Sequence, residues 1–139
     1  MKKHESTYRV PYADTDQMKV VYYANYFIYF ERSRTDMLRD LGVSYREMEE
    51  RGFILPVAEA RCKYKSPAKY DDLLTFRSWV SELRGVQLTV TTEVWRDDTL
   101  LVEGEVKLAC VNADHKLTRL PDFFVEACKA VMETPEGGK

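Results

Sequence analysis

The sequence is poor in the residues that build disulfide frameworks and metal sites. Its 139 residues include three cysteines and two histidines. Cys62, Cys110 and Cys128 lie far apart, form no CxxC pair and are odd in number. Neither His4 nor His115 has a second ligand nearby in the sequence. These shortages argue against a disulfide scaffold and a zinc site, and they predict buried thiols in a reducing compartment.

Long apolar runs are also missing. The longest, residues 20–30, is interrupted by Asn25 and is much shorter than the roughly 20 residues that a transmembrane helix needs. Lys2 and Lys3 would suit a signal peptide, but no apolar segment follows them. We therefore expect a cytoplasmic protein.

The chain has no large excess of charge of either sign. The 21 lysines and arginines nearly balance the 23 aspartates and glutamates, so the formal net charge is -2. The basic residues are scattered and do not cluster with the aromatic residues. Both features argue against a nucleic-acid-binding protein.

The composition that is present is typical of one folded domain. Hydrophobic residues make up 45% of the chain and charged residues 32%, which is ordinary for a globular protein. We predict a single domain over residues 1–139, in which residues 134–139 form a polar, disordered tail.

Apolar periodicity divides the chain into helices and strands. Spacings of three and four residues predict a long helix from Asn25 to Leu41, and Ser44 and Glu47 have the spacing of a capping box for a short second helix. Alternating apolar residues predict antiparallel strands that are covered on one face. The expected strands are residues 6–11, 54–64, 74–80, 88–94 and 100–110, and a last helix is expected over residues 121–132.

This order of elements predicts the α+β class. One curved antiparallel sheet wrapped around one long central helix would bury both apolar faces. In the last long strand, the inward residues should be Leu100, Val102, Gly104, Val106, Leu108 and Cys110. A lone sheet of this size has open edges, and pairing them across a two-fold axis predicts a dimer.

Residues Tyr12 to Arg34 are the least ordinary part of the chain. The five residues Tyr26–Phe30 are apolar on every side, so we expect the first turns of the long helix to be enclosed on all faces. Asn25 is expected to cap this helix, whose N-terminus favours nearby negative charge. Asp14 and Asp16 precede it, and from spacing alone each can be a turn or cap residue or a functional carboxylate.

The same stretch resembles the hallmark of the hotdog-fold acyl-CoA thioesterases of the 4-hydroxybenzoyl-CoA type. The motif runs Asp-Gln-Met-Lys-Val-Val-Tyr-Tyr-Ala-Asn-Tyr over residues 16–26 and continues as Phe-Glu-Arg-Ser-Arg over residues 30–34. A second similarity is Tyr-Lys-Ser-Pro-Ala-Lys-Tyr-Asp-Asp, residues 64–72. The resemblance extends from Thr7 to Met132 and is to the Tol–Pal-associated branch of the family.

The resemblance implies that Asp16 is the catalytic carboxylate. Two roles are open, namely nucleophile on the thioester carbonyl or general base for a water. The backbone amide of Tyr23 is the implied donor to the oxyanion. We interpret Asp14 as a solvated turn residue, and no metal or organic cofactor is needed for this chemistry.

Two positions depart from the family pattern. Lys19 stands where many members carry glycine, so a positive φ in this turn would have a side-chain cost. Tyr23 occupies a place where one branch has histidine. The implied role of residue 23 uses its backbone amide, so a change of side chain leaves that role intact.

Six residues are implied in substrate binding. Lys65 and Lys69 flank a turn and can hold the phosphates of coenzyme A, although ordinary surface lysines would look the same. The tyrosines of the set can line an acyl pocket or belong to the core. The whole set is Tyr22, Asn25, Tyr26, Lys65, Ser66 and Lys69.

The predicted function is hydrolysis of an acyl-CoA by a homo-oligomer, a dimer or a tetramer. One alternative is a non-hydrolytic protein that binds acyl-CoA or acyl carrier protein. Another is a hotdog dehydratase, which would need a histidine in the site, whereas His4 and His115 lie outside the Asp16 region. The acyl group and its carrier, coenzyme A or acyl carrier protein, stay open at this point.

Overall fold

A computed structural model describes residues 2–133, and every helix and strand expected from the sequence is present in it. The ends of these elements differ from the predicted ends by a few residues. The predicted tail, residues 134–139, lies outside the described residues. In chain order the elements are β1 (His4–Arg9), a 3-10 turn (Tyr12–Asp14), α1 (Asn25–Asp40), α2 (Tyr45–Glu50), β2 (Val57–Tyr64), β3 (Leu73–Arg84), β4 (Gln87–Arg96), β5 (Thr99–Ala109) and α3 (Asp122–Met132).

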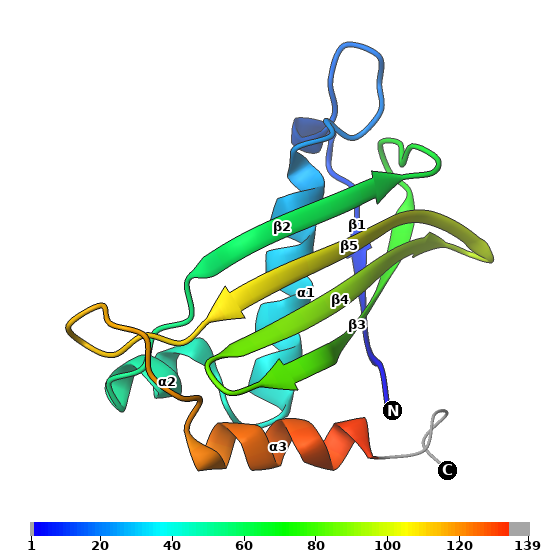
Figure 1. Ribbon diagram of the computed structural model, residues 1–139. Helices are drawn as coiled ribbons and strands as arrows, with labels where there is room; N and C mark the ends of the chain where they lie inside the picture. The colour runs from blue at the N-terminus through cyan, green and yellow to red at the C-terminus, as the bar shows by residue number, and fades with distance from the viewer. Residues whose placement is uncertain (1, 134–139) are drawn as a thin grey trace.

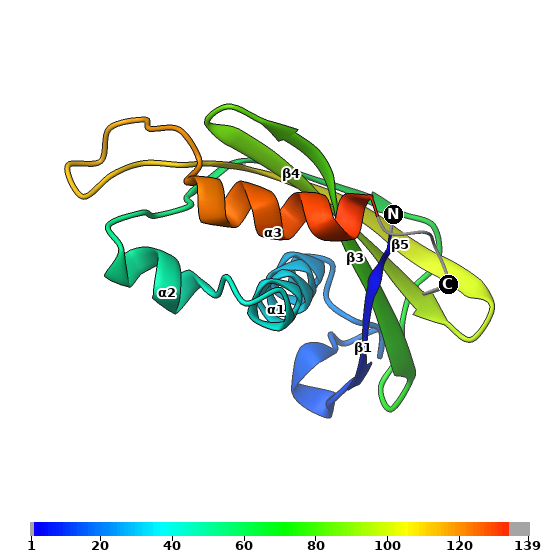
Figure 2. The ribbon, with the colours of Figure 1, turned by 90° about the horizontal axis from the view of Figure 1, so that it is seen from below.

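The strands form one antiparallel sheet in the order β1-β3-β4-β5-β2. β1 and β2 are therefore its two edges. α1 crosses one face of the sheet (Figure 1), and in Figure 2, which looks nearly along α1, the sheet arcs around the helix. This is the predicted hotdog architecture.

Alternation along the strands follows the prediction in β3 and, apart from Thr89, which is buried as well, in β4. Leu74, Phe76, Ser78 and Val80 are buried, and so are Leu88, Val90, Thr92 and Val94. In β5 the prediction for Leu100 is wrong, because Leu101 is fully buried and Leu100 is only half-buried. The pairing between β4 and β5 shifts between Val94 and Trp95, and this irregularity moves the inward position by one residue.

α1 buries one stripe of its surface, and the prediction that its first turns are enclosed on all sides is wrong for this chain. Tyr26, Tyr29 and Phe30 face the sheet and are almost fully buried. Phe27 and Ile28 keep 39% and 56% of their surface exposed. A single sheet covers only one side of a helix, so the outer side of α1 has no cover within the described chain.

Close contact between α1 and the sheet depends on Gly104 in β5. A Cβ atom at Gly104 would lie 2.2 Å from the ring of Phe30, so the ring occupies the space that any side chain there would need. Buried hydroxyl groups also link α1 to the sheet. The hydroxyl of Ser33 in α1 is hydrogen-bonded to that of Ser78 in β3 at 2.5 Å, and Ser78 is hydrogen-bonded to Thr92 in β4 at 2.8 Å. These contacts fix the depth at which α1 sits in the sheet.

The cysteines and the short helices agree with most of the remaining predictions. The Ser44 hydroxyl accepts a hydrogen bond from the Glu47 amide, as expected for a cap of α2. All three thiols are free, with Cys110 and Cys128 buried, but the expectation of burial is wrong for Cys62, which is only half-buried. No helix within residues 2–133 is long and apolar enough to cross a membrane.

Candidate active site

The chain between the 3-10 turn and α1 forms a small hairpin, which lies at the top of Figure 1. Asp16 belongs to this hairpin. The Asp16 amide donates to the carbonyl of Val20 at 2.9 Å, and a bridge between Thr15 and Val21 closes the base. Lys19 has φ +66°, so the positive φ anticipated at this position is present. For a residue other than glycine, this conformation costs roughly 1–2 kcal/mol.

The Asp16 carboxylate is partly exposed and has an open oxygen. Its Oδ1 atom accepts a hydrogen bond from the Met18 amide at 2.8 Å, which orients the side chain inside the hairpin. Among the described residues, none hydrogen-bonds the other carboxylate oxygen. One oxygen is therefore held and the other can meet a substrate or a water.

The N-terminus of α1 offers backbone donors close to this hairpin. The amides of Asn25, Tyr26 and Phe27 donate to carbonyls three residues back. In the described part of the chain no acceptor bonds the Tyr23 or Ala24 amide. These two N–H groups, at the positive end of the helix, are free to bind a developing negative charge.

The predicted role of Asn25 as the helix cap is wrong. Ala24 holds the cap position without a side-chain bond, and Asn25 is the first helical residue. The Asn25 side chain instead donates Nδ2–H to the carbonyl of Asp14 at 2.9 Å. It ties the helix start to the turn that precedes the Asp16 hairpin.

Asp16 and the Tyr23 region line one open hollow of about 290 Å³. The turn between β2 and β3 forms the other wall of the hollow. It is held beside the Asp16 hairpin by a hydrogen bond from the Val21 amide to the Ala68 carbonyl at 2.8 Å. The hollow brings together five of the predicted site residues, Asp16, Tyr23, Tyr26, Lys65 and Ser66, with Met18, Val20, Val21, Tyr64 and Pro67.

Tyr64 is a lining residue that the sequence prediction missed. Its hydroxyl donates to the Tyr23 carbonyl at 3.0 Å, and its ring lies 5.6 Å from the ring of Tyr26. Burial, followed by a hydrogen bond with Cys62, raises the pKa of Tyr64 to about 12. The phenol therefore stays protonated and donates to the Tyr23 carbonyl, which restrains the local backbone. Tyr64 is the first residue of the second family-like motif, and this position was the signal in the sequence that could have identified it as a site residue.

Three predicted binding residues do not line the hollow. Tyr22 is 45% exposed and packs its ring against that of Tyr23 at 4.8 Å. Asn25 points to Asp14, as described above. Lys69 is exposed beside the β2–β3 turn, where its backbone amide donates to Asp72.

Asp14 is not the solvated turn residue that was predicted. Its Oδ2 atom accepts the hydroxyl protons of Tyr8 at 2.7 Å and Tyr29 at 2.8 Å. Its carbonyl accepts from the Tyr22 amide as well as from Asn25. Packing of β1 against α1 brings these partners to a residue that looks like an ordinary turn aspartate in the sequence.

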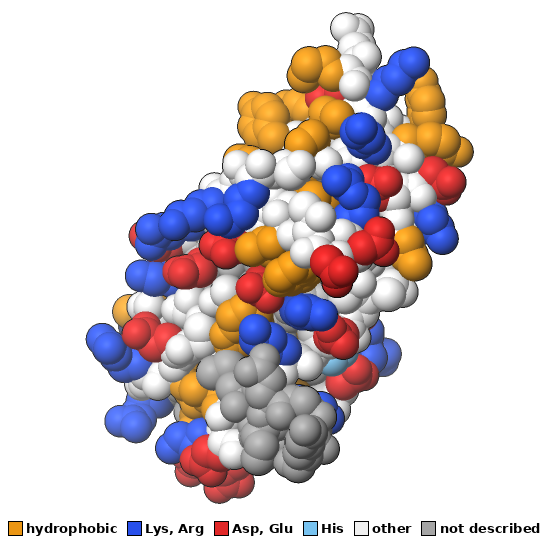
Figure 3. Space-filling model, turned by 90° about the vertical axis from the view of Figure 1, so that its right-hand side faces the viewer, with side chains coloured by type: hydrophobic (Ala, Val, Ile, Leu, Met, Phe, Trp, Pro, Cys, Tyr) orange, Lys and Arg blue, Asp and Glu red, His pale blue; other side chains and the backbone are white. Residues whose placement is uncertain are grey.

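Exposed apolar side chains gather around this end of the molecule, as Figure 3 shows at the top of the space-filling view. They come from the loop before α1, the start of α1 and the β2–β3 region, and include Tyr12, Met18, Tyr22, Tyr23, Ile28, Tyr64 and Tyr70. An apolar rim of this kind suits an apolar ligand or a partner surface.

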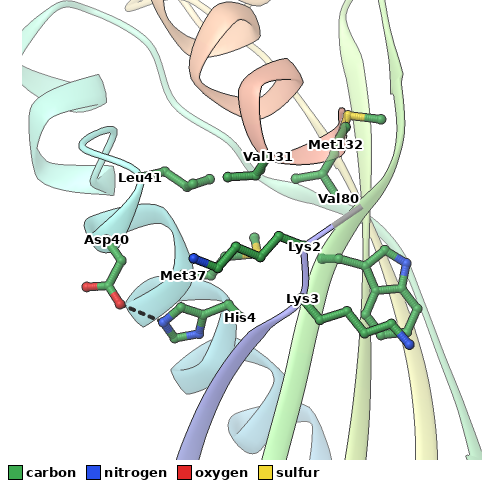
Figure 4. Close-up of a pocket in the computed structure, with 10 residues that line it drawn as sticks. Lys2, Lys3, His4, Met37, Asp40, Leu41, Val80, Val131 and Met132 are labelled. Atoms are coloured by element: carbon green, nitrogen blue, oxygen red, sulfur yellow. Dashed lines mark hydrogen bonds and ion pairs between the residues drawn. The ribbon is translucent and has the colours of Figure 1, made fainter. Parts of the chain in front are cut away.

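A second pocket, of about 230 Å³, lies at the opposite end of α1 (Figure 4). The 16 residues of α1 span about 24 Å, so this pocket is remote from Asp16. His4 Nε2 lies 2.7 Å from Asp40 Oδ2 there, and the apolar wall includes Met37 and Leu41. No residue predicted for catalysis or substrate binding lines it. Within residues 2–133, no three metal-binding side chains gather at either pocket or elsewhere.

Comparisons with known proteins agree on one family. The model of the thioesterase-like superfamily matches residues 10–128. The Escherichia coli acyl-CoA thioester hydrolase YbgC is 36% identical over 105 residues, which cover 75% of this chain and 78% of YbgC. The Bacillus subtilis protein YneP is 40% identical over 76 residues, or 55% of each chain.

A solved structure extends the similarity to nearly the whole fold. The DHNA-CoA thioesterase of Staphylococcus aureus superposes with a TM-score of 0.88 at 31% identity. The match covers 95% of this chain and 92% of the other. The match of the family model over residues 10–128 spans both the Asp16 hairpin and the β2–β3 turn that line the hollow.

Proposed function

The chain belongs to the thioesterase-like superfamily, and from this premise we propose that it hydrolyses an acyl-CoA to the free acid and coenzyme A. Asp16 acts as nucleophile or general base, and the backbone amide of Tyr23 polarises the thioester carbonyl. The observation that carries the proposal is the open Asp16 carboxylate oxygen in the same hollow as Tyr23.

The Tyr23 amide has the properties that an oxyanion donor needs. It stands at the N-terminal end of α1, where the helix dipole adds to its own partial charge. Tyr64 holds the carbonyl of the same residue at 3.0 Å, which limits rotation of the local backbone. A donor fixed before the reaction stabilises the oxyanion at no reorganisation cost, and loss of one such donor costs roughly a hundredfold in kcat.

Two routes use this arrangement. In the nucleophilic route, Asp16 attacks the carbonyl carbon, the C–S bond breaks, coenzyme A leaves as the thiolate, and water hydrolyses the resulting anhydride. In the general-base route, Asp16 takes a proton from water as the water attacks, and the proton then passes to the departing thiolate. Both routes release one acid and one thiol.

Lys65 and Ser66 are the proposed contacts for the polar part of the substrate. They lie on the wall of the hollow opposite the Asp16 hairpin. An ammonium group at this rim can bind a phosphate of coenzyme A. Tyr26 and Tyr64 line the same hollow with aromatic surface, and apolar surface of this kind can accommodate an acyl group.

The test is release of free thiol from a panel of short, long and aromatic acyl-CoAs. Asp16→Asn should lower kcat by roughly a hundredfold or more, because the amide can neither attack nor accept a proton. Asp98→Asn, in the exposed β4–β5 turn, is the matched control and should keep wild-type activity. If no thioester is cleaved, or if Asp16→Asn keeps full activity, the mechanism is wrong.

Two further measurements separate the alternative functions. Binding of acyl-CoA without thiol release would identify a non-hydrolytic binding protein. Loss of water from a hydroxyacyl-CoA would identify a dehydratase, although neither His4 nor His115 lines the Asp16 hollow. Incorporation of oxygen-18 from water into Asp16 during a single turnover would identify the nucleophilic route.

A further inference from the structure

Asp14 accepts four hydrogen bonds, which join the 3-10 turn to β1, to the segment before α1 and to α1. Its carboxylate Oδ2 accepts the hydroxyl of Tyr8 in β1 at 2.7 Å and that of Tyr29 in α1 at 2.8 Å. Its carbonyl accepts from the Tyr22 amide and the Asn25 side chain, both at 2.9 Å. A surface turn residue does not need this many bonds.

The two hydroxyl donors are rigidly placed. The rings of Tyr8 and Tyr29 lie 5.0 Å apart, and each also packs on Phe76 of β3, at 5.7 and 5.5 Å. The guanidinium of Arg32 lies over the Tyr8 ring at 4.8 Å. Aromatic packing therefore holds both phenols, and the phenols in turn hold the Asp14 carboxylate in one position.

The proton of each bond belongs to the phenol. Burial, followed by the hydrogen bond to Asp14, raises the pKa of Tyr8 to about 12, and the same two causes raise the pKa of Tyr29. Both tyrosines therefore stay protonated at neutral pH and donate to a carboxylate oxygen. Hydrogen bonds to a charged acceptor are about twice as strong as neutral ones.

The position of Asp14 gives these bonds a consequence for the site. It is two residues before Asp16, and its carbonyl bonds the residue just before Tyr23. The Asp14–Tyr22 bond and the Thr15–Val21 bridge together form the base of the hairpin that carries Asp16. Movement at this base would change the separation of the Asp16 carboxylate and the Tyr23 amide.

We propose that Asp14 is a positioning residue, which anchors the base of the Asp16 hairpin to β1 and α1 through Tyr8 and Tyr29 and thereby sets Asp16 against the Tyr23 amide. The inference rests on the proposed function. Asp14 does not line the hollow, so it has no expected contact with the substrate. Its loss should therefore lower kcat much more than it changes KM.

The test measures kcat and KM for thiol release by Asp14→Ala and Asp14→Asn. Asp14→Ala should lower kcat about tenfold to a hundredfold, because a displacement of about 1 Å has effects of this size, while KM stays within about twofold. Asp14→Asn keeps an oxygen that accepts both hydroxyls, so it should recover most of the kcat. An Asn variant as slow as the Ala variant would contradict the proposed role of these bonds.

A double variant distinguishes positioning from general damage to the fold. In an Asp16→Asn background, Asp14→Ala should cause no further loss of kcat, because there is no catalytic carboxylate left to position. Ser44→Ala, which removes the cap of α2 far from the hollow, is the control for destabilisation. It should lower the melting temperature without changing kcat per folded molecule.

The remaining outcomes are also decisive. If Asp14→Ala does not fold, Tyr8→Phe combined with Tyr29→Phe keeps both rings and should show the same loss of kcat. Wild-type kcat in Asp14→Ala or in this double Phe variant, with Asp16→Asn inactive, would overturn only the positioning role. Full activity of Asp16→Asn would overturn the proposed mechanism and the positioning role together.

Discussion

At the scale of single residues, the ionisation of Tyr8 links the site to the stability of the fold. The folded-state pKa of Tyr8 is about 12, above the ordinary value of 10.0. Below pH 10 the phenol is protonated in both states and its contribution to stability is complete. As the pH rises from about 10 to about 12, the unfolded chain releases this proton first, so the contribution is lost.

Tyr8→Phe should therefore change the dependence of stability on alkaline pH. Phe keeps the ring contacts with Tyr29 and Phe76 but has no proton to lose. We expect the free energy of unfolding of this variant to fall less steeply than that of the wild type between about pH 10 and pH 12. Urea denaturation at several pH values measures both slopes, and parallel slopes would contradict the prediction.

The backbone conformation of Lys19 could be predicted from the sequence, whereas the hydrogen bonds of Asp14 could not. The positive φ of Lys19 was foreseeable, because the motif has a turn position that commonly holds glycine. The environment of Asp14 was not foreseeable, because its partner Tyr29 is fifteen residues away and reaches it only when α1 packs beside β1. Local backbone geometry leaves a trace in the sequence, whereas a tertiary hydrogen bond leaves none.

At the scale of elements, Gly104 of β5 lies against the ring of Phe30 in α1 with no room for a side chain. Gly104→Ala would place a Cβ atom 2.2 Å from the ring, so the ring or the strand must move. We expect a loss of about 1–3 kcal/mol in the free energy of unfolding, as for other overpacked cores. Chemical denaturation measures this loss.

A second variant tests whether the ring is the cause. Phe30→Leu shortens the side chain that meets the new methyl group, so Gly104→Ala should cost less in that background than in the wild type. Equal costs in both backgrounds would show that Gly104 is needed for its backbone freedom or for pairing with Cys62 and Thr92, and not for the ring.

The elements themselves were predictable where burial is one-sided and regular. A strand with one covered face must alternate, so the inward residues of β3 and β4 could be assigned, although Thr89 of β4 is buried as well. Leu100 was assigned wrongly because the irregularity beside Trp95 inserts one residue into β5, and a single extra residue reverses the alternation. Asn25 was assigned wrongly because a cap depends on the path of the chain before the helix, which residue types alone do not fix.

At the scale of the whole molecule, the hollow unites residues about 50 positions apart. Asp16 and Lys65 line the same hollow because Val21, in the Asp16 hairpin, donates its amide to the carbonyl of Ala68 in the turn after β2. Periodicity predicted the sheet and the helix but not this contact, and the family resemblance supplied the pairing. The exposed Phe27 and Ile28 also belong to this scale, since only another chain or a ligand could enclose them.

The edge strand β2 is the proposed surface for self-association. It pairs with β5 on one side only, and all eight of its residues are exposed except the half-buried Cys62. The Lys65 amide donates to the carbonyl of Leu101, next to β2 in the antiparallel register. In an antiparallel pair, successive residues of a strand point their N–H groups alternately toward and away from the partner strand, so the odd-numbered residues of β2 point theirs at β5. The N–H groups of Ala60 and Cys62 then face the open edge, where a second copy could pair with them.

Ala60→Pro should separate the predicted dimer without unfolding the chain. Proline removes an edge-facing donor and leaves the β5 ladder intact, and edge strands tolerate it. Ala60→Val keeps the N–H group and suits a strand, so it serves as the control and should stay associated. Light scattering on the eluting protein should give twice the chain mass or a higher multiple for the wild type and Ala60→Val, and the single-chain mass for Ala60→Pro.

A monomeric wild type would refute self-association. An associated Ala60→Pro would place the interface elsewhere, with the exposed Phe27 and Ile28 as the next surface to test.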